Sequence, residues 1–158
     1  MTLIFSGMPT ALADAYRGGA PDANGQVPER KISDGDGVPC RHCLGYVAKG
    51  EPYLVLAYRP FPTLQPYAET GPIFLHAEPC PAYSPAQGRP ERLGGNSEVI
   101  LRGYGADDRI VYGTGIVVPP REVETRAEAI FAHDGVAYVH VRSATNNCYA
   151  LRIDRAPD

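Results

Sequence analysis

The chain has 158 residues, of which 44% are hydrophobic and 21% are charged, and its formal net charge is −3. These values are ordinary for a folded protein of this size, and we expect residues 1–158 to form a single domain with its own core. The charge gives no reason to expect binding to nucleic acid or to an anionic membrane surface, and no apolar run reaches the length of a membrane span.

The N-terminal segment contains Ala11-Leu12-Ala13, which is similar to a signal-peptidase site. However, no Lys or Arg precedes Arg17, and polar or turn-forming residues interrupt the apolar stretch between Ser6 and Pro9. A secretory signal has a basic start and a continuous apolar middle, so we expect a cytoplasmic protein. In a reducing cytosol its four cysteines are thiols or metal ligands, not structural disulfides.

The first half of the chain predicts short elements separated by turns. Thr2 to Phe5 favours a strand, Ala11 to Tyr16 a helical turn, and Gly18 to Glu29 a surface loop. The almost wholly apolar run Tyr53 to Tyr58 predicts a strand that is buried on both faces. The segment from Pro60 to Pro90 holds half of the sixteen prolines and predicts a stiff surface excursion with one short strand near residues 72–77.

The second half predicts two hairpins with a helix between them. Residues 99–102 and 109–112 flank a turn at 105–108, and residues 136–142 and 148–153 flank a turn at 143–147. Between them, apolar residues recur at helical spacing from Arg121 to His133. Strands and helices do not alternate as a parallel sheet requires. The predicted fold is therefore α+β, a mostly antiparallel sheet of short strands and hairpins with one main helix near residues 121–133.

The cysteines and histidines define the first candidate site. Cys40-x-x-Cys43 followed by Gly45 has the form of a zinc knuckle, in which two thiolates hold one ion from a tight turn that glycine relieves. His76-x-x-x-Cys80 has the right residue types to complete a tetrahedral zinc site.

The same cluster has other interpretations. His42 could replace one of the four ligands, and buried thiols also pack simply as small apolar groups. A redox Cys-x-x-Cys normally begins a helix, whereas Gly45 and Gly50 favour turns here. The spacing permits a zinc site but does not require one.

A second candidate site consists of arginines that lie beside tyrosines in the predicted strands. Its members are Arg59, Arg102, Tyr104, Arg109 and Arg142. Guanidinium groups bind carboxylates and phosphates, and tyrosine adds flat contact area. If one sheet face collects these side chains, it would bind a small anionic molecule; solvated sheet faces have the same composition.

A third candidate is a nucleophile and base pair made by Cys148 and His140 in the last hairpin. If the turn centres on Thr145, Arg142 faces Cys148 and His140 lies diagonally near the thiol, whereas a shift of one residue separates them. The pattern also predicts a core face and an opposite face. The core face would hold Val139, Val141, Tyr149, Leu151 and Ile153, and the opposite face would hold Tyr138, His140 and Arg142.

Several stretches of the chain resemble a bacterial family known only as domain of unknown function 1203. The resemblance is carried by Pro39–Leu44, Leu54–Phe61, Gln65–Phe74, Tyr138–Arg142 and Asn147–Tyr149. It implies no activity, substrate or catalytic residue. From the residues themselves we favour a domain that binds a small anionic ligand, with a structural zinc domain as the main alternative and a Cys148/His140 enzyme as a weaker one.

Overall fold

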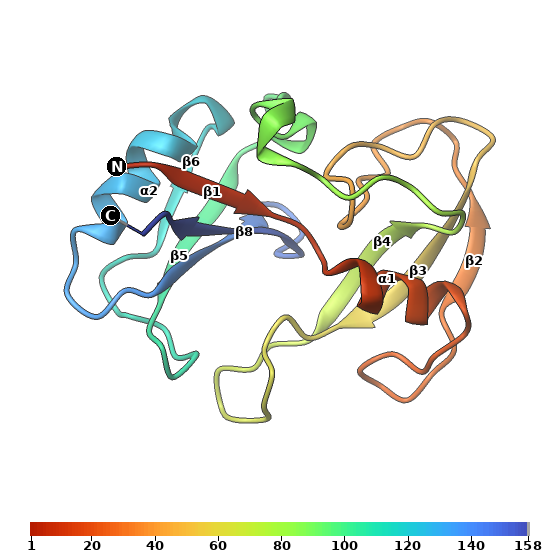
Figure 1. Ribbon diagram of the computed structural model, residues 1–158, viewed down its shortest axis with the longest axis horizontal. Helices are drawn as coiled ribbons and strands as arrows, with labels where there is room; N and C mark the ends of the chain where they lie inside the picture. The colour runs from red at the N-terminus through yellow and green to blue at the C-terminus, as the bar shows by residue number, and fades with distance from the viewer. Residues whose placement is uncertain (158) are drawn as a thin grey trace.

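The computed structural model describes residues 1–157 and contains two antiparallel β-sheets (Figure 1). The five-stranded sheet has the order β1-β8-β7-β5-β6, and the three-stranded sheet has the order β2-β3-β4. The predicted α+β class with mostly antiparallel strands is thus confirmed. The strands of the larger sheet are β1 (Leu3–Ser6), β5 (Val99–Tyr104), β6 (Ile116–Val118), β7 (Tyr138–Ser143) and β8 (Tyr149–Arg155).

The main helix covers one face of the five-stranded sheet. A 3-10 turn at Pro120–Glu122 leads into α2 (Val123–Phe131), within the predicted range of 121–133. Its apolar residues pack against the inner residues of β5, β7 and β8 in one continuous core. Among residues 1–157, no helix combines the length and the apolar character that crossing a membrane requires.

The opposite face of the five-stranded sheet is also buried along β7 and at the end of β5, because other parts of the chain pack against it there. Tyr138, His140 and Arg142 are each at most 4% exposed, and Phe61 from the proline-rich segment contacts the rings of Tyr104 and His140. A β-bulge lies between the two strands of the last hairpin, so that Arg142 pairs with Tyr149. The prediction that Tyr149 lies on the core face with Val139 and Val141 was wrong. The bulge turns the Tyr149 ring to the opposite face of the sheet.

The three-stranded sheet carries the second core. It consists of β2 (Glu29–Ile32), β3 (Pro52–Tyr58) and β4 (Gly71–His76). Helix α1 (Thr10–Arg17) lies over this sheet and buries Ala13 and Tyr16 against it (Figure 1). The prediction that β3 is buried on both faces was wrong: alternate residues are fully buried and those between them only partly, as in a sheet with one face toward the core.

The first predicted hairpin has a different second strand. β5 pairs with β6 at residues 116–118, whereas residues 109–112 contribute only a single bridge, between Tyr104 and Ile110. Asp108 and Gly113 both have positive φ, which interrupts an extended ladder. The Thr114 hydroxyl accepts a hydrogen bond from Gly103 N and donates one to Val111 O, so a side chain replaces the ladder there.

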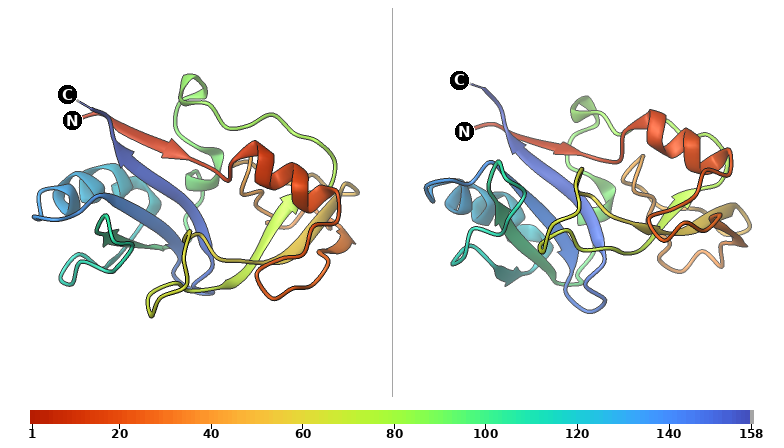
Figure 2. Two further views of the ribbon diagram at one scale, coloured as in Figure 1. Left: turned by 60° about the horizontal axis from the view of Figure 1, so that its bottom comes forward. Right: turned by 90° about the horizontal axis from the view of Figure 1, so that it is seen from below.

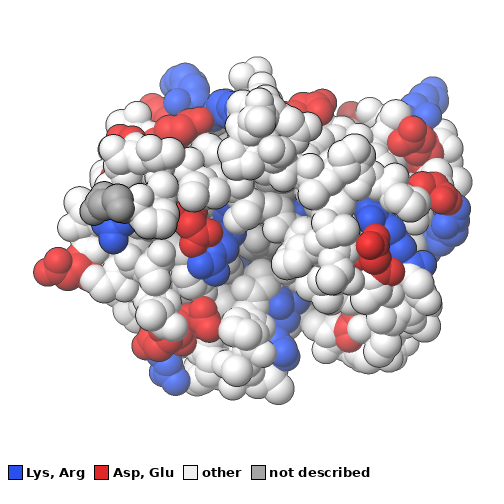
Figure 3. All heavy atoms as spheres, viewed as in Figure 1, with Lys and Arg blue, Asp and Glu red and all other residues white. Residues whose placement is uncertain are grey.

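The two ends of the chain lie side by side because β1 pairs with β8, and Figure 2 shows this from two further directions. β8 is also part of the second core through Tyr149. On the face drawn in Figure 3, Lys and Arg side chains are interspersed with Asp and Glu, and the surface is hollowed between the parts built on the two sheets.

Candidate metal centre

The first half of the cysteine cluster is a closed turn, which we call the knuckle (residues 39–46). Pro39 and Tyr46 form a bridge at its base, Cys40 N donates to Gly45 O, and Leu44 N donates to Cys40 O. The positive φ that the turn needs falls on Leu44, at 58°, and not on Gly45 as the sequence suggested. Leu44 is 1% exposed in the main core, and this burial holds its backbone in the left-handed region.

The β3–β4 hairpin brings the second half of the cluster to the knuckle. In its register Tyr53 pairs with His76, the last residue of β4, and Cys80 follows four residues later. The knuckle lies against the same strand, because Arg41 N donates to Phe74 O at 3.2 Å. Two motifs that are separated by a strand and a proline-rich segment therefore meet at one strand end.

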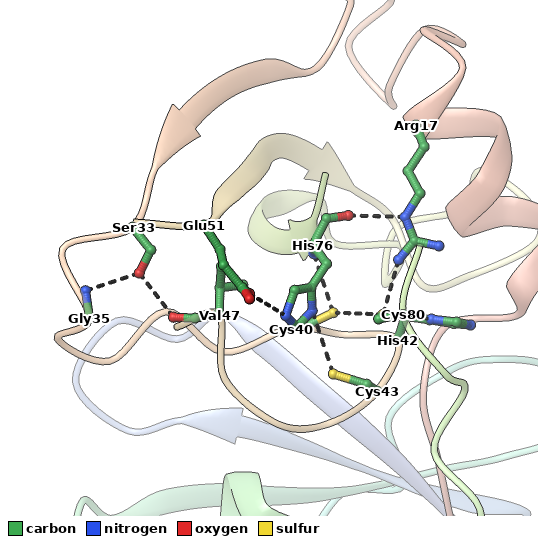
Figure 4. A network of polar contacts seen from close by, with 10 residues as sticks. All are labelled: Arg17, Ser33, Gly35, Cys40, His42, Cys43, Val47, Glu51, His76 and Cys80. Atoms are coloured by element: carbon green, nitrogen blue, oxygen red, sulfur yellow. Dashed lines mark hydrogen bonds and ion pairs between the residues drawn. The ribbon is translucent and has the colours of Figure 1, made fainter. Parts of the chain in front are cut away.

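The four candidate ligands converge. The Cys40 and Cys80 sulfurs are 3.9 Å apart, and Cys43 Sγ is 3.6 Å from His76 Nδ1. All four ligand atoms lie within 4.8 Å of one another (Figure 4). Zinc bonds of about 2.3 Å to sulfur and about 2.0 Å to nitrogen, at tetrahedral angles, place two sulfurs about 3.8 Å apart and a sulfur about 3.5 Å from a nitrogen. These two ligand pairs already have this spacing.

A disulfide does not explain the cluster. A sulfur–sulfur bond is about 2.05 Å long, and all four cysteines are free thiols. The chain leaves the knuckle through turns rather than through a helix, which agrees with the argument against a redox Cys-x-x-Cys.

Hydrogen bonds link the acidities of the three thiols. Hydrogen bonds with Cys43 and Cys80 lower the pKa of Cys40, and the hydrogen bond with Cys40 raises the pKa of Cys43 and that of Cys80. The first proton to leave therefore makes the others harder to remove. A bound cation removes this obstacle, because it stabilises three thiolates together.

Polar groups around the cluster fix the orientation of the ligands. Glu51 lies 3.7 Å from His76 Nε2, so that Nδ1 faces the thiols, an arrangement common around zinc-bound histidines. Arg17 donates to Cys80 Sγ at 3.1 Å and to His76 O at 3.0 Å (Figure 4). Its positive charge matches the net charge of −1 that Zn²⁺ with three thiolates would carry.

His42 is outside the four-ligand cluster. Its Nδ1 is 3.1 Å from Cys80 Sγ and its Nε2 is 2.8 Å from the Thr10 hydroxyl. The ring is 1% exposed, and this burial is the main reason that the pKa of His42 is lowered. His42 thus contacts a candidate ligand, and its use in place of one of the four stays a prediction.

Three of the five residues proposed for an anion site gather on one sheet face. Arg102 Nη1 and Arg142 Nη2 lie 3.2 and 3.1 Å from the two carboxylate oxygens of Glu69. The buried Tyr104 hydroxyl nearby has no hydrogen-bond partner among the described residues. The two guanidiniums on this face therefore already share a carboxylate from the proteinʼs own chain.

The other two arginines of that set lie elsewhere. Arg59 donates to Phe61 O, and the Arg109 guanidinium stacks over the Tyr67 ring at 5.6 Å. The structure does not bring either one to Glu69.

Cys148 and His140 are also apart. Cys148 precedes β8, and its sulfur is 3.6 Å from Asn146 O. The bulge places Tyr149, not Cys148, opposite Arg142, and His140 pairs with Arg152. Within residues 1–157 no hydrogen bond joins the imidazole to the thiol, and burial together with nearby arginines lowers the pKa of His140 to about 2.

The four candidate ligands could be identified from the sequence, but the groups around them could not. Arg17 and Glu51 come from α1 and from the turn before β3, at no motif spacing from the cysteines. Only the folded chain shows that they contact ligands. His42 lies inside the motif itself, and its position between two cysteines was the one available signal.

One comparison with known proteins found a matching family. A family described as a protein of unknown function (DUF1203) matches residues 37–155, which is more than half of the chain and includes all four candidate ligands. The chain belongs to this family, as the sequence motifs indicated. No curated protein and no solved structure matches it.

Proposed function

We propose that this protein is a zinc-binding domain in which Cys40, Cys43, His76 and Cys80 hold one structural Zn²⁺. The observation that carries the proposal is the mutual approach of three sulfurs and one imidazole nitrogen within 4.8 Å. Soft thiolate donors with one imidazole in tetrahedral spacing favour zinc over magnesium or calcium, which prefer oxygen ligands.

The role is structural rather than catalytic because the ligand set is closed. Four protein side chains fill the four positions of tetrahedral zinc, and none is left for water or substrate. Cys40 is 1% exposed, and the other three ligands are partly buried. The ion would join the knuckle, the end of β4 and the segment that follows it, and through Arg17 also helix α1.

The remaining hypotheses stay predictions. An anion on the sheet face would have to compete with Glu69 for Arg102 and Arg142. A reaction at Cys148 would need a base other than His140, which is buried on the aromatic face.

The experiment is metal analysis of the purified protein and of two serine variants. The wild-type protein should contain one zinc per chain, and Cys80→Ser should lose most of it because a hydroxyl is a poor zinc ligand. Cys148→Ser changes the one cysteine outside the cluster and should keep a full equivalent.

Each outcome of the metal analysis has a clear meaning. Zinc below a tenth of an equivalent in the wild-type protein, even after incubation with zinc salt, would overturn the proposal. Equal zinc in the two serine variants would overturn the assignment of the ligands. A melting temperature that falls on chelation in the wild type, but not in Cys80→Ser, would show that the bound ion stabilises the fold.

A further inference from the structure

A cavity of about 760 Å³ lies beside the knuckle and is separate from the four metal ligands. Its walls come from the knuckle, the start of β4, residues 92–97 and the turn between β7 and β8. Segments from both sheets therefore line the cavity. Many small-molecule sites likewise lie between two parts of a structure.

Two guanidinium groups line this cavity without a carboxylate of their own. Arg41 is 4% exposed; its Nε donates to Tyr149 O and its Nη1 to Pro39 O. Arg92 also lines the cavity, and its buried Nε has no hydrogen-bond partner among the described residues. Within residues 1–157, neither side chain forms an ion pair.

Burying a positive charge without a counter-ion is unfavourable, and proteins normally pair such groups. The contrast with the sheet face is informative. There Glu69 is shared by Arg102 and Arg142. In the cavity, Arg41 has only neutral carbonyl partners, and the buried Nε of Arg92 has no partner among the described residues. A ligand that balances the two guanidinium charges would therefore be an anion.

The rest of the lining suits the same kind of ligand. The hairpin turn contributes the Ser143 and Thr145 hydroxyls and the Asn146 amide, all groups that can donate to an anionic oxygen. On other walls the rings of Tyr46 and Phe74 offer apolar contact for the carbon part of a molecule.

We propose that this cavity binds a small organic oxyanion, a carboxylate or a phosphate, through the guanidiniums of Arg41 and Arg92. Guanidinium forks match the geometry of both groups. Arg41 lies between two of the metal ligands, so the knuckle that holds the metal also presents the guanidinium. The anion site uses none of the four ligand side chains and is tested separately from the metal.

Cys148 lines the same cavity and serves as a built-in reporter. The experiment compares how fast neutral iodoacetamide and anionic iodoacetate alkylate Cys148 in the purified protein, with peptide mass spectrometry to separate it from the other cysteines. Both reagents attack the same thiolate, so the ratio of the two rates is independent of the ionised fraction. N-acetylcysteine gives the reference ratio.

We expect the iodoacetate to iodoacetamide ratio at Cys148 to exceed the reference about tenfold, because paired guanidiniums concentrate anions near the thiol. Arg92→Gln should return the ratio toward the reference. Arg126→Gln removes an equal charge from an exposed position on α2 and should leave the ratio unchanged.

Two further arms identify the oxyanion. Inorganic phosphate and acetate are each added before iodoacetamide. The anion that slows alkylation of Cys148 more shows whether the cavity prefers a phosphate or a carboxylate. A ratio equal to that of N-acetylcysteine, an Arg92→Gln ratio equal to the wild type, or no protection by either anion would overturn the proposal.

Discussion

Replacing His140 with phenylalanine should make the free energy of unfolding decrease much less when the pH is lowered to mildly acidic values. The imidazole is 1% exposed and is surrounded by the rings of Phe61, Tyr104, Tyr138 and Tyr149 at centroid distances of 4.9 to 5.2 Å. Its Nδ1 is buried without a hydrogen-bond partner among the described residues. A phenyl ring of similar size therefore fits the site and leaves no polar atom unsatisfied.

The sign of the pH effect follows from the pKa of His140. Burial, with Arg142, Arg152 and Arg102 nearby, lowers it from 6.5 to about 2 in the folded protein. Between these two values the unfolded chain binds more protons than the folded chain, so stability falls as pH falls below 6.5. From about pH 7 to about pH 5, this single group removes about 2 kcal/mol of the free energy of unfolding.

The assay is urea unfolding followed by circular dichroism at both pH values, at one fixed zinc concentration. His140→Phe should lose about 2 kcal/mol less than the wild type on acidification. Tyr104→Phe is the matched control: it changes a ring that packs at a tilt against His140 but keeps the imidazole, so it should keep the wild-type pH dependence. Equal losses in His140→Phe and the wild type would refute this reasoning.

Two further substitutions, with one control, test how the cluster is positioned. Gly7→Ala places a Cβ 2.6 Å from the Arg41 carbonyl oxygen in the knuckle, so the variant should lower both zinc affinity and melting temperature. A Cβ added at Gly71 would meet no such neighbour within 4 Å, so Gly71→Ala should change neither zinc affinity nor melting temperature. Equal effects of Gly7→Ala and Gly71→Ala would contradict this expectation. Glu51→Ala should weaken zinc binding about tenfold by freeing the His76 ring, as measured by competition with a chromophoric chelator; unchanged affinity would exclude a role for this carboxylate.

The sequence was sufficient to predict the ligand types but not their convergence. Cys40 and Cys43 lie at a spacing with a known chemical meaning, whereas His76 and Cys80 are brought to them by a strand register. Register depends on the pairing of β3 with β4, and no local pattern determines it across the long proline-rich segment. The expected class, α+β with hairpins, followed from short-range signals and was confirmed.

Two of the errors share a physical cause. The bulge at Ala150 reversed the face of Tyr149, and a Thr114 side chain replaced a ladder that residues 109–112 were expected to form. Both are single-residue events that override a period-two pattern. The two arginines of the cavity were missed for a different reason. Arg41 and Arg92 are far apart in the sequence, and no motif around either one indicates that they line the same cavity.

The most direct test of the central claim is X-ray absorption at the zinc edge of the purified protein. We expect a first shell of three sulfurs at about 2.3 Å and one nitrogen at about 2.0 Å. A shell of nitrogen and oxygen alone would contradict it, because zinc would then be bound outside the cluster of Cys40, Cys43, His76 and Cys80.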